Sequence, residues 1–408
     1  MSGARLGNFV FAQPTAALAT PPNIVISLFL RGGMDALSFL PPYDDSNYHT
    51  ARPRLGLRSS QALDLDGRFG LHPSAAALKE LYDSQNLGIV CAAGSPHPTR
   101  SHFEAQDYMD RGIPGDDGYS QGGWLARYLA RNPTDAIFGG ISVGSGVVLS
   151  LQGHRNALSL NSASGFTLSG SGSHLDDLRR SLRTMWSGDS QLATTALQTL
   201  DAADQIDHAN PDDYVPPPGV VYPNNSLGNA FKSLAQIIRL DLGLQAATVD
   251  YGGWDTHESQ ANSGNSATGS FADLITSLSS ALMAFWNDLS AYRPRLTVVV
   301  MSEFGRRLRE NGNRGTDHGH AGMMMVLSDA LTDKKVWGTW PGLATDQLFE
   351  SVDLAVTTDY RTVLAEIIGA RLRVANAQSL FPGFTYPGPL GMLTALPPAV
   401  GVNGVLIQ

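Results

Sequence analysis

Five runs of apolar residues along the chain have the length and composition of buried β-strands. They cover residues 23–30, 87–94, 246–253, 296–305 and 323–329. Apolar and β-branched residues follow one another in these runs, without the polar alternation of a strand that has one face in water. Polar sequence that contains glycine follows each of the first four runs. The pattern therefore predicts strands that are covered on both faces.

Apolar residues between these runs recur at helical spacing. The clearest examples lie at 74–85, 226–243 and 270–292. A further helix is predicted to begin at Ser101, which forms a capping box with Glu104, and to stop at Gly112. Strands that alternate with helices predict an α/β fold, with a mainly parallel central sheet and helices on both faces. Ligands in such folds bind at the carboxyl ends of the strands.

The segment 139–225 differs from the rest of the chain, because it is rich in Gly and Ser and ends in a Pro-rich stretch. We interpret it as an insertion or cap over the sheet of a single domain that covers residues 23–408. Residues 1–22 are apolar and contain an Ala-Leu-Ala stretch at 17–19. They are predicted to form an N-terminal arm or the remnant of an export signal.

Charge and composition narrow the choice of partners and of site. Lys and Arg number 28 against 37 Asp and Glu, a net charge of −9, and no long basic run occurs, so nucleic acid is not an expected partner. No apolar run reaches the ~18 residues of a membrane-spanning helix, so no membrane span is expected. The single cysteine, Cys91, excludes an intramolecular disulfide and a zinc site with several thiolates. A metal ion would therefore be held by imidazole and carboxylate groups.

Two clusters of Asp and His contain the residue types that hold divalent cations. In the sequence WDTH, Asp255 and His257 stand two residues apart at the end of a predicted strand, so both are expected to point to the same side. In the sequence DHGH, which begins at Asp317, His318 and His320 have the same spacing. The glycine between them permits a close backbone approach. We therefore predict that the two clusters bind metal.

The sequence PHPTRSHFEAQ offers a hydroxyl group at the N-terminus of a predicted helix, where the helix dipole and free N–H groups lower the cost of an alkoxide. Ser101 is the preferred candidate nucleophile and Thr99 is the alternative, while an ordinary N-cap is the competing structural explanation. Arg100 and Arg306 are candidates to hold a tetrahedral oxyanion, and surface ion pairs are the competing explanation for them. His102 is interpreted as an ordinary hydrogen-bonded histidine.

Taken in order, the segments LRGGMDAL, PHPTRSHFEAQDYM, GGWDTH, MSEFGRR and TDHGHAG resemble the bacterial domain-of-unknown-function family 1501. That family is grouped with the alkaline phosphatase and sulfatase superfamily. The similarity extends from about residue 23 to the predicted helix at 361–369. GGWDTH together with DHGHAG makes the assignment to the family specific. The resemblance implies an alkaline-phosphatase-like sandwich.

In this superfamily an Asp at the end of the first strand, a nucleophile at a helix start, and later Asp and His residues hold two cations that clamp a phosphate or sulfate ester. The resemblance would make Asp35 the first ligand and Ser101 or Thr99 the nucleophile. Asp255 and His257 would serve one metal ion. The remaining ligands of the two ions would be Glu303, Asp317, His318 and His320. The chain differs from the superfamily at 302–304, where Ser-Glu-Phe replaces the usual Asp-His pair.

The sequence therefore predicts a metal-dependent hydrolase of phosphate or sulfate esters that uses one or two divalent cations, Zn²⁺, Mn²⁺, Mg²⁺ or Ca²⁺. Its expected substrate is a small anionic ester or a sulfated or phosphorylated glycan. The alternatives are a non-catalytic, metal-binding exported protein and a phosphoryl-transfer or mutase enzyme with the same site. The resemblance also implies a periplasmic or secreted location. Members of the family frequently carry a twin-arginine export signal, but no Arg-Arg pair stands near this N-terminus.

Overall fold

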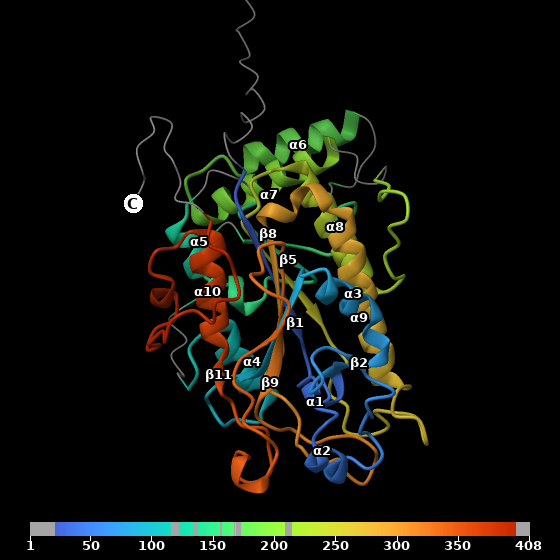
Figure 1. Ribbon diagram of the computed structural model, residues 1–408. Helices are drawn as coiled ribbons and strands as arrows, with labels where there is room; N and C mark the ends of the chain where they lie inside the picture. The colour runs from blue at the N-terminus through green and yellow to red at the C-terminus, as the bar shows by residue number, and fades with distance from the viewer. Residues whose placement is uncertain are drawn as a thin grey trace, which may run out of the picture.

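The structure, a computed structural model, confirms the five predicted strands and joins them in one sheet (Figure 1). It describes residues 21–115, 122–133, 138–155, 157–166, 168, 173–208 and 214–396. The five strands are β1 (Ile24–Leu30), β4 (Leu87–Gly94), β7 (Ala246–Tyr251), β8 (Leu296–Met301) and β9 (Gly322–Leu327). Every residue of β1, β4, β8 and β9 is buried, as expected for strands that are covered on both faces.

The main sheet has nine strands in the order β10-β4-β9-β8-β1-β7-β5-β6, and β11 also pairs with β4. Its remaining strands are β5 (Gly140–Val143), β6 (Ala157–Leu160), β10 (Val336–Trp337) and β11 (Thr358–Asp359). A separate small sheet consists of β2 (Leu63–Asp64) and β3 (Gly70–Leu71). In the main sheet β9 is antiparallel to both of its neighbours, and all other pairs are parallel. The sheet is therefore mainly parallel, as predicted.

The reversed direction of β9 determines which loops meet. The carboxyl ends of β1, β4, β7 and β8 lie at one edge of the sheet because these strands run parallel to one another. Since β9 runs the opposite way, the residues that precede it arrive at that same edge. The DHGH sequence directly precedes β9. The topology therefore brings it to the loops that follow β7 and β8.

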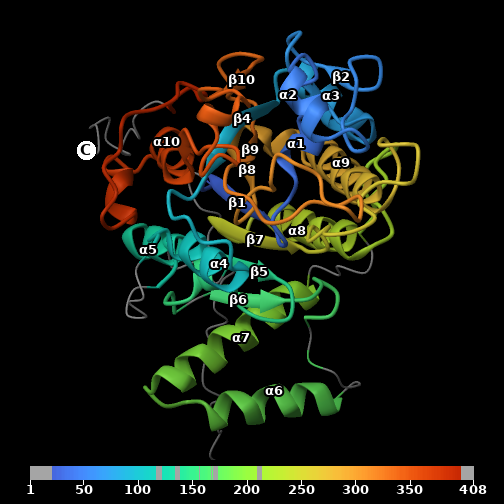
Figure 2. The same ribbon diagram turned by 90° about the horizontal axis from the view of Figure 1, so that it is seen from below.

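Helices cover both faces of the sheet (Figures 1 and 2). On one face lie α3 (Ala76–Asp83), α8 (Ser226–Leu240) and α9 (Ser270–Asp288). On the other face lie α4 (His102–Arg111), α5 (Trp124–Arg131) and α10 (Tyr360–Leu372). Alternate residues of β1 divide between these layers: Ile26 and Leu28 belong to the first core, and Val25 and Phe29 to the second. This division explains why the apolar run of β1 is continuous.

The remaining helices lie at the ends and edges of the sheet. They are α1 (Ala36–Phe39), α2 (Ser46–Ala51), α6 (Ser173–Met185) and α7 (Gln191–His208). The segment 139–225, expected as an insertion or cap, begins with β5 and β6, which extend the main sheet beyond β7. Figure 2 shows α7 and α6 beyond β6, the edge strand. The first part of this segment is thus built into the sheet. Residues 1–20 of the expected N-terminal arm lie outside the described residues.

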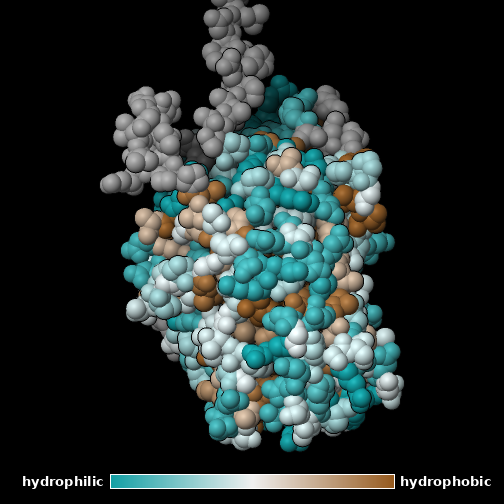
Figure 3. Space-filling model, in the orientation of Figure 1, coloured by the Kyte–Doolittle hydropathy of each residue, from teal (hydrophilic) through white to brown (hydrophobic). Residues whose placement is uncertain are grey.

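The surface in Figure 3 carries small groups of hydrophobic residues that hydrophilic residues separate. Within the described ranges, no helix combines the length and the apolar character that crossing a membrane requires.

A buried ion pair joins the end of β1 to the segments around it. The guanidinium group of Arg52 donates to both carboxylate oxygens of Asp35 at 2.7 and 2.9 Å, and both side chains are 0% exposed. Gln260 donates to the same carboxylate at 2.7 Å, and Arg52 also donates to the backbone oxygens of Leu308 and Arg307. Burial alone would raise the pKa of Asp35, but the charge and hydrogen bonds of Arg52 lower it below its ordinary value.

We expect the substitution Asp35→Asn to reduce the free energy of unfolding by about 3 kcal/mol or more, because it leaves the buried Arg52 without a counter-charge. The carboxylate contributes this stability above its unfolded pKa near 3.8 and loses it as the pH falls through the lower folded value. The difference between the variant and the wild type should therefore shrink on acidification. Urea unfolding at several pH values measures it. Asp44→Asn, at a half-exposed carboxylate, is the control and should cost less than about 0.5 kcal/mol.

Candidate metal centre

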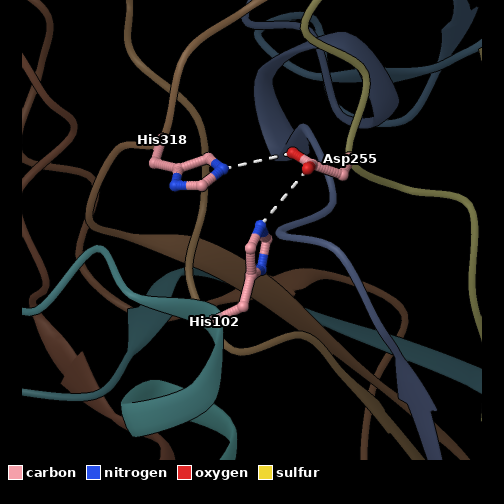
Figure 4. A group of neighbouring side chains, drawn as sticks. All are labelled: His102, Asp255 and His318. Carbon is pink, nitrogen blue, oxygen red and sulfur yellow. Dashed lines mark hydrogen bonds and ion pairs between the residues drawn. The ribbon is translucent and has the colours of Figure 1, made fainter.

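Three side chains from distant parts of the chain converge at the carboxyl edge of the sheet (Figure 4). Asp255 lies in the loop after β7, His102 is the first residue of α4 after β4, and His318 precedes β9. One ligand atom from each of them lies within 4.8 Å of the other two. The Nε2 atom of His318 is 3.1 Å from Oδ1 of Asp255, and Nε2 of His102 is 3.5 Å from Oδ2. Two imidazoles and one carboxylate therefore face a common point.

Glu303 orients His102. Its carboxylate is buried at the end of β8, and Oε1 lies 2.8 Å from Nδ1 of His102. The same oxygen accepts hydrogen bonds from Gln106 at 2.7 Å and from the backbone of Gly32 at 2.9 Å. Because an ionised carboxylate only accepts, the imidazole proton lies on Nδ1 and the lone pair lies on Nε2. The hydrogen bond that His102 donates to Glu303 also raises the pKa of His102.

A backbone oxygen orients His318 in the same way. Its Nδ1 atom lies 2.8 Å from the carbonyl oxygen of Arg100, which can only accept a hydrogen bond. The proton therefore lies on Nδ1 and Nε2 carries the lone pair that faces Asp255. Burial lowers the pKa of His318, and the positive charge of Arg306 lowers it further. These effects favour the neutral imidazole that a metal requires.

His257 adds a third imidazole to the cluster. Its Nε2 atom lies 3.0 Å from Oδ1 of Asp255 and 2.9 Å from Nε2 of His318. Its Nδ1 atom lies 3.3 Å from Asp317, a carboxylate that Asn311 also contacts at 3.2 Å. Asp255 and His257 therefore lie in contact, as expected. Asp317 contacts the opposite side of the His257 ring from Asp255.

The donor atoms fit a divalent cation. The Nε2 atom of His102 is buried and has no hydrogen-bond partner within the described part of the chain. The hydrogen bond and the positive charge of Arg306 lower the pKa of Asp255 to about 2 against the effect of burial, so its carboxylate is ionised. Imidazole nitrogen and carboxylate oxygen are ligands of Zn²⁺ and similar ions, and imidazole ligands that donate their second N–H to a carboxylate or carbonyl are typical of such sites.

The two arginines that the sequence assigned to an oxyanion have other partners. Arg306 has a fully buried side chain that donates to backbone oxygens of Gly33 and Thr316 and, at 2.5 Å, to Asp255. The guanidinium group of Arg100 binds Asp353 at 2.5 Å and Glu350 at 2.7 Å. Arg306 therefore organises the loops of the cluster. Arg100 contacts the cluster through its backbone oxygen, which accepts a hydrogen bond from His318.

Two residues that the sequence assigned to the metal lie elsewhere. Both carboxylate oxygens of Asp35 accept hydrogen bonds from Arg52, and one also accepts from Gln260. Asp35 is therefore not part of the cluster in which it was expected as the first ligand. His320 is buried against the ring of Phe349, with centroids 4.1 Å apart, and burial lowers its pKa to about 4. The equal spacing of the histidines in DHGH therefore did not place both at one ion. Glu303, also expected as a ligand, contacts His102 instead.

Ser101 and Thr99 have different environments. Ser101 is the N-cap residue of α4, as predicted, but its side chain makes no capping hydrogen bond. The predicted capping box with Glu104 is wrong, because Glu104 accepts a hydrogen bond from Thr99 at 2.6 Å. The Thr99 oxygen also accepts from the backbone of Ser101 at 3.2 Å. The Thr99 hydroxyl is therefore bonded within its own turn, whereas Ser101 directly precedes His102 of the cluster.

Glycine permits the close packing of the loops that carry these residues. Gly32 has φ +124°, and a Cβ atom there would lie 2.5 Å from the backbone nitrogen of Asp255. A Cβ atom at Gly319 would lie 2.4 Å from the carbonyl carbon of Arg306. The backbone approach expected between the histidines of DHGH is thus present.

Sequence reasoning missed His102. The available signal was the spacing of His102 and Gln106, four residues apart on one helix, since both contact Glu303. The partner of this pair is distant in sequence, so the spacing alone did not identify it.

The comparisons with known proteins identify the family. The sequence matches the family described as "Protein of unknown function (DUF1501)" over residues 92–381, more than half of the chain. No curated protein matches the chain.

Several solved structures are distantly similar to the chain. The C-terminal periplasmic domain of EcEptC from Escherichia coli, in complex with Zn, has 9% identity and a TM-score of 0.37, with 78% of each chain covered. The lipoteichoic acid synthase LtaP from Listeria monocytogenes has 9% identity and a TM-score of 0.37, over 79% of this chain and 69% of that one. A protein in the alkaline phosphatase superfamily from Vibrio parahaemolyticus has 11% identity and a TM-score of 0.32, over 78% and 66%.

Similarities this distant carry no conclusion about activity. The sequence match is of another kind, because it extends from β4 through α4 and the metal-centre loops to α10. The chain belongs to the DUF1501 family.

Proposed function

We propose that this protein is a hydrolase of phosphate or sulfate esters that depends on one divalent cation held by His102, Asp255, His257 and His318. One observation carries the proposal. Both His102 and His318 keep the proton on Nδ1 through a fixed acceptor, so both direct an Nε2 lone pair toward the carboxylate of Asp255. This arrangement lies at the carboxyl edge of a mainly parallel sheet, where α/β enzymes bind their ligands.

The protein supplies the negative charge and the fixed lone pairs of the site. A bound divalent cation would stabilise charge on an ester oxygen and lower the pKa of a hydroxyl group or water. Glu303 and the backbone oxygen of Arg100 hold the imidazoles in position, and Arg306 fixes the loops that carry Asp255 and Thr316.

Ser101 is the preferred nucleophile in this proposal. Its side chain does not cap α4, and it directly precedes His102 at the positive end of the helix. Thr99 is disfavoured because its hydroxyl already donates to Glu104. The substrate is expected to be a small anionic ester or a sulfated or phosphorylated glycan, and a periplasmic or secreted location belongs to the same proposal through the resemblance of the sequence.

A structural metal site without catalysis is the second candidate function. The contacts of the two arginines favour it, because Arg306 is buried among backbone oxygens and Arg100 is paired with Asp353 and Glu350. Both guanidinium groups therefore already have hydrogen-bond or ion-pair partners, which leaves neither free to bind an oxyanion. Chelation separates the candidates: loss of turnover with little loss of stability supports the hydrolase, and unfolding of a protein that never hydrolyses an ester supports the structural site.

We expect Asp255→Asn and His318→Ala to lower the affinity for Zn²⁺ or Mn²⁺ by more than about 100-fold, because each removes a ligand. Elemental analysis after dialysis should find about one ion per wild-type chain. The control is His208→Ala, at an exposed histidine far along the chain from the cluster, which should retain the ion. Full metal content in both cluster variants would refute the site.

Glu303→Ala should reduce metal affinity by about 10- to 100-fold without removing a ligand, because His102 loses the acceptor that fixes its tautomer. Glu303→Gln keeps an oxygen acceptor at the same place and should lose less. Competition with a chromogenic chelator measures both affinities. Equal affinities for wild type and Glu303→Ala would show that Glu303 does not position His102.

Ser101→Ala should reduce kcat on phosphate or sulfate esters by about 1000-fold or more while metal content is unchanged, since the variant removes the proposed nucleophile. Thr99→Val is the matched control and should keep kcat within about tenfold, because its hydroxyl is bound to Glu104. Steady-state rates on both ester types measure the effect. Retention of wild-type kcat in Ser101→Ala would exclude Ser101 as the nucleophile.

A further inference from the structure

A polar pocket is lined in part by two loops, the one after β7 that carries His257 and the one before β9 that carries Asp317. Its volume is about 370 Å³. The residues that matter for its chemistry include three arginines and three polar residues on three segments of the chain: Arg54, Arg58, Gln61, Asn262, Ser263 and Arg314. No acidic side chain is among the described residues that line it.

The positive charge of this pocket is only partly balanced. Arg54 pairs with Glu310, whose carboxylate is 2.6 Å from its Nε atom. The side chains of Arg58 and Arg314 form no ion pair or hydrogen bond with any residue that the structure describes. The pocket therefore contains two uncompensated guanidinium groups in a protein with a net charge of −9. An uncompensated pair of this kind attracts anions.

The backbone at Arg314 is held in a conformation that arginine rarely adopts. Its φ is +59°, in the left-handed region. The side chain of Asn311 accepts hydrogen bonds from the backbone of Asn313 and Gly315, and Gln260 donates its backbone N–H to the oxygen of Arg314 at 2.9 Å. Strained positions of non-glycine residues cluster at ligand sites. The surrounding contacts thus fix Arg314 at the wall of the pocket.

The same loop joins the pocket to the metal centre. Asn311 donates to the backbone oxygen of His257 at 2.7 Å, and Thr316 donates its backbone N–H to Thr256 at 3.1 Å. Arg314 is four residues from His318, a proposed metal ligand, so their Cα atoms lie within about 14 Å of each other. An ester whose second anionic group lies at such a distance from the bond to be cleaved can contact both the pocket and the metal centre.

We infer that the pocket between Arg58 and Arg314 binds a second oxyanion group of the substrate. The inference rests on the proposed ester hydrolysis, and it defines the substrate class as an ester that carries at least two anionic groups. A sulfate, phosphate or carboxylate group shares the required chemistry, because guanidinium groups bind such oxygens through paired N–H donors. The ester to be cleaved lies at the metal centre, and the second anion lies in the pocket.

Calorimetric titration of the full-length, metal-free protein with inorganic sulfate, inorganic phosphate or acetate tests the pocket without any need for turnover. We expect Arg58→Gln and Arg314→Gly each to weaken binding of the preferred anion by about tenfold or more. Glycine adopts a positive φ readily, so the melting temperature of Arg314→Gly should not fall below that of the wild type. A weaker affinity in this variant would then reflect loss of the guanidinium group and not loss of folding. Arg155→Gln, which removes one exposed positive charge near β6, is the matched control.

Equal affinity in the wild type and both pocket variants overturns the inference, and so does equal weakening by Arg155→Gln. A second measurement compares kcat/KM for an ester with one anionic group and for an ester with two. Arg58→Gln should reduce kcat/KM about tenfold for the second ester only. Equal reduction for both esters overturns the assignment to substrate. Weakened anion binding in a protein that cleaves no ester would instead refute the hydrolase and leave the anion site standing.

Discussion

The candidate metal centre depends on one constraint: a neutral imidazole offers a lone pair on one nitrogen only, and the surroundings of each ring determine which nitrogen that is. At His102 the buried carboxylate of Glu303 accepts a hydrogen bond from Nδ1, and at His318 the backbone oxygen of Arg100 does the same. Without these acceptors both rings could turn or change tautomer, and the two Nε2 atoms would not face Asp255 together.

Two buried charged residues that follow β8, Glu303 and Arg306, hold these groups in place. A buried carboxylate is costly unless it is hydrogen-bonded, and Glu303 receives donors from His102, Gln106 and the backbone of Gly32. These donors come from the loop after β1 and from α4, so the carboxylate also ties three segments together. Arg306 has the complementary role, because it is a buried cation that binds backbone oxygens and the carboxylate of Asp255.

The sequence predicted five strands of the sheet because these strands are continuous apolar runs of strand length. It also placed Asp255 and His257 together, from the rule that residues two apart share one side of an extended chain. The structure brings them together in another way, because β7 ends at Tyr251 and the backbone N–H of His257 donates to the oxygen of Asp255 at 3.2 Å in a turn. The same rule failed for His318 and His320, where the chain bridges to Arg306 and His320 packs against Phe349. Spacing describes local direction only. The contact between His102 and Glu303 joins residues about 200 positions apart, and only the strand order determines it.

The distribution of contacts favours one cation over the pair that the resemblance implied. A second ion would need ligands of its own, and three candidates for that role have other partners: Asp35 pairs with Arg52, Glu303 accepts hydrogen bonds at both oxygens, and His320 packs against an apolar ring. Within the described residues, the cluster around Asp255 is the one group of ligand atoms close enough for an ion. Even there, Oδ1 of Asp255 already accepts a hydrogen bond from Arg306, while Oδ2 has only the distant Nε2 of His102. Oδ2 is therefore the carboxylate oxygen of Asp255 that would bind the proposed cation between His102 and His318.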